Sequence, residues 1–191
     1  MRTVPLFKVF MADTAPAAVS KVLTSGFVGQ GPQVEAFESK VRAYFNHDYC
    51  LSLNSGTSGL HLALHLLKNA GDRMPGWSQW QGLKPGHEVL TTALTCTASN
   101  WPILANGLKI KWVDVNPATL NLDYDDLERK ITPNTRAIMV VHWGGYPNDI
   151  DNLKEIQTKT QAMYGFKPAI IEDCAHAFGS EYKGKKVGTV S

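Results

Sequence analysis

Two carboxylates that follow a short apolar run are the residues with the clearest chemical potential. Residues 169–179 read AIIEDCAHAFG, so Glu172 and Asp173 come at the carboxyl end of a segment with the composition of a buried strand. A carboxylate there is costly to bury unless a cation or several hydrogen-bond donors face it. In open parallel sheets this edge is also where ligands bind. Asp173 or Glu172 therefore faces a bound positive charge or accepts several hydrogen bonds; alternatively, Asp173 is the N-cap of a helix that begins near Ala175.

A second candidate site is the segment from Ser55 to Gly59, which reads SGTSG and lies between an expected strand and an expected helix. Small residues at such a junction let backbone N–H groups approach an anion, and the helix N-terminus favours negative charge. Thr57 and Ser58 add hydroxyl donors. The spacing is neither that of a dinucleotide-binding loop nor that of a P-loop. A phosphate cradle and an ordinary capped turn both remain open for this segment alone.

The two candidate sites belong to the same edge of the expected sheet, and together they indicate one kind of ligand. A molecule with a phosphate at one end and a protonatable ring nitrogen at the other satisfies both, and pyridoxal 5′-phosphate is such a molecule. A carboxylate against its ring nitrogen keeps the ring protonated and able to accept electrons from a substrate carbanion. At about 4 Å and an effective dielectric constant of about 20, such an ion pair is worth up to ~4 kcal/mol before desolvation.

Other residues carry weaker signals. His142 ends an expected strand at the same edge of the sheet, where either packing or function explains it. His61 and His65 have the spacing of two zinc ligands on a helix, but no third ligand is evident. We therefore expect no metal site.

The elements that must position these residues alternate along the chain. Loosely alternating or apolar runs predict strands over residues 49–53, 88–91, 110–114, 136–142 and 169–173. Helical periodicity and capping residues predict helices over residues 13–24, 32–45, 97–106, 122–131 and 149–164, with another that follows residue 59 and closes at Gly71. Such alternation is typical of an α/β fold, a three-layer sandwich with a mostly parallel sheet.

Composition excludes several classes of protein. The chain has 191 residues, 43% of them hydrophobic and 19% charged, which is ordinary for a globular protein. A net charge of +2 with no basic stripe argues against nucleic-acid binding. Three widely spaced cysteines fit a reducing compartment. Without a signal-peptide core or a long apolar run, we expect a cytoplasmic protein with no membrane partner.

Many ordered motifs resemble the N-terminal half of a nucleotide-sugar aminotransferase, a pyridoxal-phosphate enzyme of the aspartate-aminotransferase fold type I. The resemblance covers nearly the whole chain. Its landmarks are GQGPQVEAFE at 29–38, NSGTSGLHLAL at 54–64, KPGHEV at 84–89, VDV at 113–115, TLN at 119–121, ITPNTRAI at 131–138, VH at 141–142, EDCAHAFG at 172–179 and YKGKKVG at 182–188.

The resemblance implies a role for individual residues. Residues 1–31 would form an N-terminal arm with a substrate-site loop, and residues 32–191 a large cofactor-binding domain that is incomplete at its C-terminus. The cofactor would be held by Ser55, Gly56 and Thr57 at its phosphate, Cys96 over its ring, Asp173 at its ring nitrogen and His176 near its ring hydroxyl. Phe27, Gly29, Gln30 and Gly31 would lie near the nucleotide-sugar substrate. Family members transfer an amino group, usually from glutamate, to a nucleotide-linked keto-sugar in polysaccharide and antibiotic-sugar biosynthesis, and act as homodimers.

Two departures from the family pattern stand out. Cys96 occupies the place where the family usually stacks an aromatic ring on the cofactor. The family's Schiff-base lysine falls beyond Ser191, and Lys183, Lys185 and Lys186 do not match it. We therefore expect residues 1–191 alone to carry no catalytic lysine and to be inactive. A sugar dehydratase, in which histidine replaces that lysine, and a non-catalytic regulatory relative are the alternatives.

Overall fold

The computed structural model describes residues 9–69 and 80–189, and the chain forms two compact units, Met1–Ser52 and Leu53–Ser191. The first unit contains α1 (Ala15–Ser25) and α2 (Pro32–Phe45). A proline in its first turn starts each helix, and Gly26 (φ 80°) and Asn46 (φ 49°) end them in the left-handed conformation. Neither helix buries a residue. The division at residue 31 that the resemblance implies stays a prediction.

The strand expected over residues 49–53 is absent, because side chains occupy the backbone groups that a sheet would use. The N–H of Tyr49 donates to Nδ1 of His47 (3.1 Å), and the N–H of Ser52 donates to Oε1 of Glu38 (2.7 Å). The Ser52 hydroxyl donates to the same carboxylate oxygen (2.8 Å). No strand within the described residues pairs with this segment. Its loose alternation therefore predicted the wrong conformation.

The second unit is built on a four-stranded parallel sheet in the order β2-β1-β3-β4. Its strands are β1 (Glu88–Thr92), β2 (Lys109–Val113), β3 (Thr135–Val141) and β4 (Ala169–Asp173). Each lies within a residue or two of the strand predicted from the sequence. A two-stranded antiparallel hairpin, β5 (Glu181–Tyr182) and β6 (Lys185–Lys186), follows β4.

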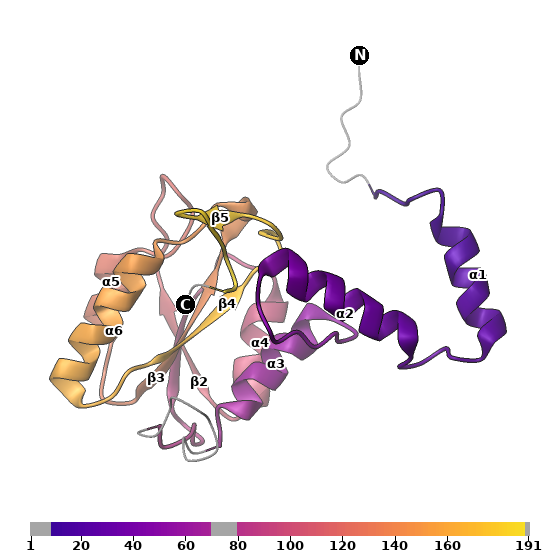
Figure 1. Ribbon diagram of the computed structural model, residues 1–191. Coiled ribbons are helices and arrows are strands. Elements are labelled where there is room, and N and C mark those ends of the chain that lie inside the picture. The colour runs from indigo at the N-terminus through magenta and orange to yellow at the C-terminus, as the bar shows by residue number, and fades with distance from the viewer. Residues whose placement is uncertain (1–8, 70–79, 190–191) are drawn as a thin grey trace. The chain divides into compact units, whose positions relative to one another are not determined.

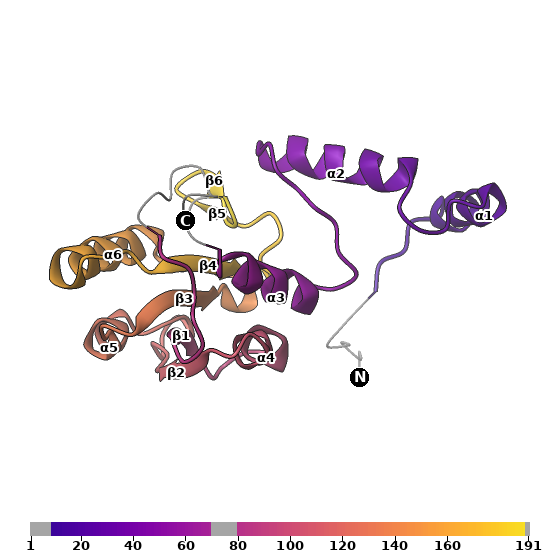
Figure 2. The same ribbon diagram turned by 90° about the horizontal axis from the view of Figure 1, so that it is seen from below.

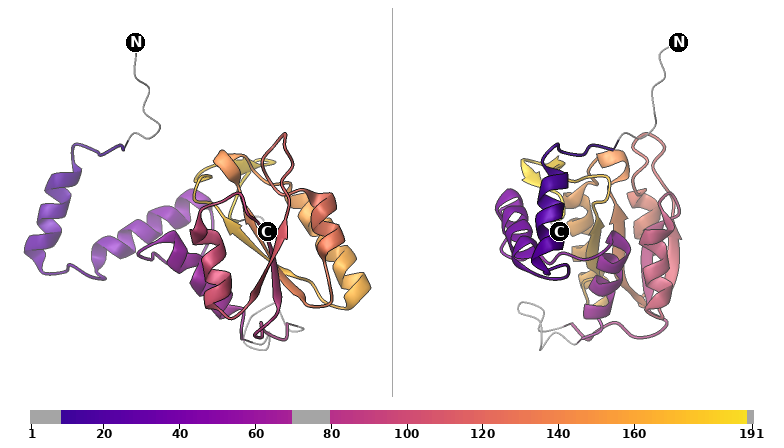
Figure 3. Two further views of the ribbon diagram at one scale, coloured as in Figure 1. Left: turned by 180° about the vertical axis from the view of Figure 1, so that it is seen from behind. Right: turned by 90° about the vertical axis from the view of Figure 1, so that its right-hand side faces the viewer.

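Helices cover both faces of the sheet, which gives the three layers predicted from the sequence (Figure 2). On one face lie α3 (Gly56–Leu66) and α4 (Thr97–Ala105), and on the other lie α5 (Tyr124–Lys130) and α6 (Ile150–Tyr164). Figures 1 and 3 show the same arrangement from the side and from behind. The strands alternate their side chains between two buried clusters, so that Val89, Ala137, Met139, Ala169 and Ile171 face α3 and α4, whereas Leu90, Ile138 and Val140 face α5 and α6.

Helix boundaries match the sequence predictions to within two residues, except at α3, which begins at Gly56 and not after residue 59. The helix expected to close at Gly71 ends at Leu66, and Gly71 itself lies outside the described residues, as does most of the loop over residues 72–86. Pro102 lies inside α4, within the range over which the sequence predicts a helix. A 3₁₀ turn, η2 (Trp143–Gly145), follows β3.

Asp126 joins α5 to the end of β2. Its Oδ2 accepts the N–H of Asp114 (2.8 Å) and Nζ of Lys130 (2.7 Å), and its Oδ1 accepts Nη2 of Arg129 (3.0 Å). The Lys130 ammonium and the Asp114 amide, opposed only in part by burial, lower the pKa of the Asp126 carboxyl from 3.8 to about 2. Because the folded-state pKa is depressed, this stabilisation is present above pH 3.8 and is lost as the pH falls toward 2.

We expect Asp126→Asn to lower the free energy of unfolding by roughly 1–3 kcal/mol at pH 7, because a largely buried carboxylate loses its charge-assisted hydrogen bonds to the Asp114 amide and to two partly exposed cations. The variant should also lose part of the acid-induced decrease in stability between pH 4 and pH 2. Urea unfolding at several pH values measures both effects. Asp125→Asn, on the exposed side of the same helix, is the matched control. Equal stability of Asp126→Asn and Asp125→Asn would contradict the assignment.

Candidate functional site

The first part of the candidate site is the N-terminus of α3, formed by the predicted SGTSG segment. Ser55 is the N-cap, and its Oγ accepts the N–H of Ser58 at 3.1 Å. The amides of Gly56 and Thr57 lie in the first turn, where no carbonyl of the helix is available to them. A Cβ placed on Gly56 would meet no heavy atom within 4 Å. The segment is thus a capped helix start with open space beside two amides, which suits an anion.

The second part is Asp173, the last residue of β4. The alternation of the strand directs it, with Ala169 and Ile171, toward the α3 and α4 face, where its exposed fraction is 8%. Its Oδ2 accepts the hydroxyl of Ser99 on α4 at 2.6 Å, and its Oδ1 accepts the N–H of Ala175 at 3.0 Å. The expected need of this carboxylate for hydrogen-bond donors is therefore met in part by the protein. The alternative, an N-cap, is wrong, because residues 174–179 form turns and no helix.

His176 lies in these turns and is exposed to solvent. Its Nδ1 accepts the N–H of Gly144 (3.3 Å), and the Trp143 ring contacts it edge-on with centroids 5.3 Å apart. Gly145 has φ 85°, and a Cβ there would come within 2.9 Å of the His176 carbonyl oxygen. The close packing of the Trp143–Gly145 turn against residue 176 therefore requires glycine at position 145.

The remaining predicted residues fall in two places. Cys96 is exposed and is the N-cap of α4, three residues before Ser99. Phe27, Gly29 and Gly31 belong to the first unit, where they line a hollow of about 800 Å³ with parts of α1 and the start of α2; Gln30 is exposed. The structure thus places the predicted cofactor residues in one unit and the predicted substrate residues in the other.

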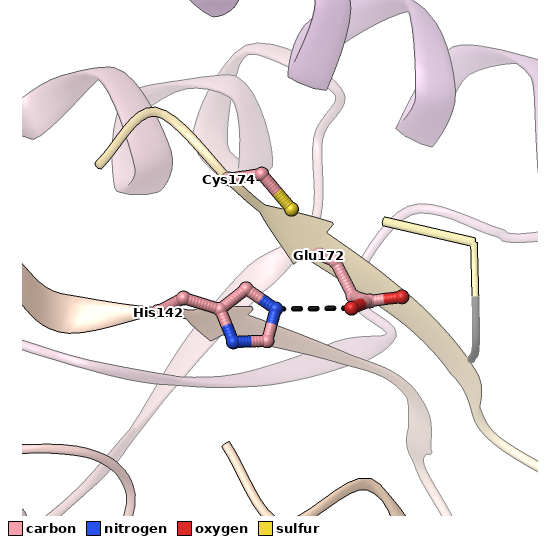
Figure 4. Close-up of side chains that lie close together, drawn as sticks. All are labelled: His142, Glu172 and Cys174. Carbon is pink, nitrogen blue, oxygen red and sulfur yellow. Dashed lines mark hydrogen bonds and ion pairs between the residues drawn. The ribbon is translucent and has the colours of Figure 1, made fainter. Parts of the chain in front are cut away.

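His142, Glu172 and Cys174 form a second cluster, with ligand atoms within 4.8 Å of one another (Figure 4). Nδ1 of His142 accepts the N–H of Asn148 (2.9 Å), so the ring proton is on Nε2, which donates to Oε2 of Glu172 (2.9 Å). A protonated Nε2 has no lone pair for a metal ion. The cluster is therefore a buried hydrogen-bonded pair, with His142 and Glu172 side chains 0% and 3% exposed.

Glu172 also holds the chain that follows the hairpin, because its Oε2 accepts the N–H of Gly188 at 2.9 Å. Gly188 has φ 85°, and a Cβ there would come within 3.2 Å of the Cys174 sulfur. Burial, with the neighbouring charges of Glu172 and Asp173, raises the pKa of the Cys174 thiol to about 12. Cys174 is therefore an inert thiol at neutral pH.

Comparison with known proteins places this geometry in a family. Residues 11–191 match the DegT/DnrJ/EryC1/StrS aminotransferase family. The chain belongs to this family. Among solved structures, the sugar aminotransferase CalS13 from Micromonospora echinospora is 48% identical, with a TM-score of 0.86, over 98% of this chain and 47% of that one.

Two further proteins that are similar to this chain extend the comparison. The pyridoxal-phosphate form of the sugar aminotransferase Spr1654 from Streptococcus pneumoniae is 29% identical, with a TM-score of 0.85, over 100% of this chain and 47% of that one. GDP-perosamine synthase from Escherichia coli O157:H7 is 33% identical over 190 residues, which are 99% of this chain and 47% of that protein. The chain therefore spans about half the length of the relatives it matches.

The family and its solved structures show a fold-type-I pyridoxal-phosphate domain, as the sequence predicted. The chemistry of the residues fits that cofactor, because open space and two amides at α3 suit its phosphate and a carboxylate at β4 suits its ring nitrogen. The individual contacts of Ser55, Gly56, Thr57, Cys96, Asp173 and His176 with it stay predictions. No helix in the described part of the chain combines the length and apolar character needed to cross a membrane.

Sequence reasoning missed Ser99, which contacts Asp173, and Thr95, whose Oγ1 lies 2.7 Å from the Ser99 hydroxyl. Ser99 lies 74 positions before Asp173, and a serine in a short helix carries no signal of such a contact. It could have been noticed only as a small polar residue at a position of α4 that faces the sheet. Glu172 and His142 were both noticed, but their contact with each other and the contact of Glu172 with the Gly188 amide were not.

We expect thiol labelling at pH 8 to be selective. Cys96 is exposed and should react first, whereas Cys174, with its pKa raised to about 12, should react only after unfolding. Reaction with a maleimide followed by peptide mapping measures both rates, and Cys96→Ser removes the fast phase as a control. Labelling of Cys174 in the folded protein as fast as that of Cys96 would show that the sulfur is not held as described.

Proposed function

We propose that the full-length protein transfers an amino group, with glutamate as donor, to a nucleotide-linked keto-sugar. The observation that carries this proposal is an open α3 N-terminus and a carboxylate at the end of β4, on the same face of one sheet, in a chain of an aminotransferase family. The similarity to CalS13 and to GDP-perosamine synthase supports a sugar substrate.

Each residue of the site has a proposed task. The amides of Gly56 and Thr57, with the Ser55 turn, would bind the cofactor phosphate. Asp173 would accept a hydrogen bond from the protonated ring nitrogen, and His176 would contact the ring hydroxyl. Cys96 would lie on the ring in place of an aromatic residue; a sulfur there recovers part of the roughly 0.5–1.5 kcal/mol that an aromatic stack supplies. When bound, the cofactor supplies an electron-accepting ring.

Phe27, Gly29, Gln30 and Gly31 would bind the nucleotide-sugar. We further propose a cytoplasmic homodimer. The exposed apolar residues of α1 and α2, among them Val19, Leu23 and Phe37, support burial of these helices against a second copy.

The resemblance places the lysine that holds the cofactor covalently beyond Ser191, so residues 1–191 alone are proposed not to transaminate. A sugar dehydratase would carry histidine at that place. The two activities differ in product, because a transaminase releases an amino-sugar nucleotide and a dehydratase releases a deoxygenated one. A non-catalytic relative would give neither product.

We expect Asp173→Asn in the full-length protein to lower the rate of amino transfer by orders of magnitude while leaving the fold intact. An amide holds a protonated ring nitrogen far less well than a carboxylate, so the electron-accepting character of the ring is lost. Single-turnover kinetics with a keto-sugar nucleotide measure the effect. Asp125→Asn, an exposed carboxylate on α5, serves as the control. Turnover of Asp173→Asn near that of the unmodified protein would rule out the assigned role.

We expect Gly56→Val to weaken cofactor binding and Gly56→Ala to weaken it less. A side chain at this position would enter the open space beside the Gly56 and Thr57 amides, where the phosphate belongs. Equilibrium titration of the full-length apoprotein with pyridoxal phosphate measures the affinity, and circular dichroism checks that helix content is unchanged. Unchanged affinity in both variants would show that residues 55–59 only cap α3.

A further inference from the structure

We propose that Ser99, supported by Thr95, is a positioning residue for Asp173. The two hydroxyls form a chain that fixes one oxygen of this carboxylate and joins it to the segment that carries Cys96. The inference rests on the proposed function, because it assigns Asp173 to the ring nitrogen of pyridoxal phosphate. It adds a residue of α4 to the site.

The hydrogen bonds that link Thr95, Ser99 and Asp173 are short and largely buried. The Ser99 hydroxyl is 2.6 Å from Oδ2 of Asp173, and Oγ1 of Thr95 is 2.7 Å from the Ser99 hydroxyl. Ser99 is completely buried, and Asp173 is 8% exposed. A buried hydroxyl costs free energy unless it is hydrogen-bonded, so these two contacts account for a serine where alanine would favour the helix more.

Each hydroxyl has a single hydrogen, which sets the direction of the hydrogen bonds from Thr95 to Ser99 and from Ser99 to Asp173. An ionised carboxylate can only accept, so with Asp173 ionised Ser99 donates to Oδ2 and Thr95 donates to Ser99. Oδ1 separately accepts the N–H of Ala175 at 3.0 Å. Each carboxylate oxygen thus has one protein donor and retains a lone pair that a protonated ring nitrogen can use.

The chain also connects two predicted cofactor contacts. Thr95 directly precedes Cys96, and Ser99 follows in the first turn of α4, where its N–H donates to the Cys96 carbonyl (3.1 Å). The residue proposed to lie on the cofactor ring is therefore tied through two hydroxyls to the residue proposed to hold its nitrogen. A fixed distance between these two contacts matters because small displacements of positioning groups lower catalytic rates.

Binding of pyridoxamine 5′-phosphate tests the inference in the full-length apoprotein, because this form of the cofactor forms no bond with a lysine. We expect Ser99→Ala to raise its Kd roughly 10-fold, the effect of losing a hydrogen bond to a charged group, and Thr95→Val to raise it by less. The double variant should bind no more weakly than Ser99→Ala alone, because Thr95 acts through Ser99. Isothermal titration calorimetry measures all three values.

Thr91→Val is the matched control. Thr91 is completely buried on β1, and its hydroxyl contacts Asn100 and not Asp173. Its affinity should stay within about twofold of that of the unmodified protein. If Ser99→Ala does not fold, Thr95→Val and Ser99→Thr decide the matter, with a loss expected only for the first.

Asp173→Ala separates this inference from the function on which it rests. Weak binding by Asp173→Ala together with unchanged binding by Ser99→Ala and Thr95→Val would overturn the role of the hydroxyl chain and leave the proposed function standing. Unchanged binding by Asp173→Ala as well would overturn both. An additive loss in the double variant would show that Thr95 acts independently of Ser99, which also contradicts the proposal.

Discussion

Two adjacent carboxylates at the end of a buried strand both need hydrogen-bond donors. The structure of the second unit around β4 depends on which donors each of them receives. Because strand side chains alternate, Asp173 turns toward α3 and α4, whereas its neighbour Glu172 meets His142 and the Gly188 amide. Asp173 receives the Ser99 hydroxyl and the Ala175 amide. Glu172 thus contacts His142 and the chain after the hairpin, whereas Asp173 keeps a lone pair on each oxygen for a ligand. Glu172 therefore stabilises the fold, whereas Asp173 is available to a ligand.

Most of the fold followed from the sequence because its signals are local. Apolar runs placed β1 to β4, and helical periodicity with capping residues placed α1, α2, α4, α5 and α6 to within two residues. The prediction of a strand over residues 49–53 was wrong because the side chains of Glu38 and His47, which lie before this segment in the chain, accept hydrogen bonds from its backbone N–H groups. The alternative that Asp173 caps a helix is wrong because residues 174–179 form turns, in which the Ala175 amide donates to the Asp173 carboxylate.

The candidate site was predictable in part. Ser55–Gly59 and Asp173 could be found because strand ends and helix starts bring ligand-binding groups to one edge of a parallel sheet. Ser99 could not, because its contact with Asp173 spans 74 positions and serine is common in helices and loops. Thr95 could not either, because it reaches the site only through its contact with the Ser99 hydroxyl. The His142–Glu172 pair could not be predicted either, because the Asn148 amide decides which ring nitrogen carries the proton.

The state of the cofactor's ring nitrogen tests the central claim most directly. Full-length protein loaded with pyridoxal phosphate labelled with ¹⁵N in the ring reports by NMR whether that nitrogen is protonated. With Asp173 against it, the nitrogen should be protonated at pH 8, where the free ring nitrogen is not, and the signal should revert in Asp173→Ala. An unprotonated nitrogen in the unmodified protein at that pH would contradict the account.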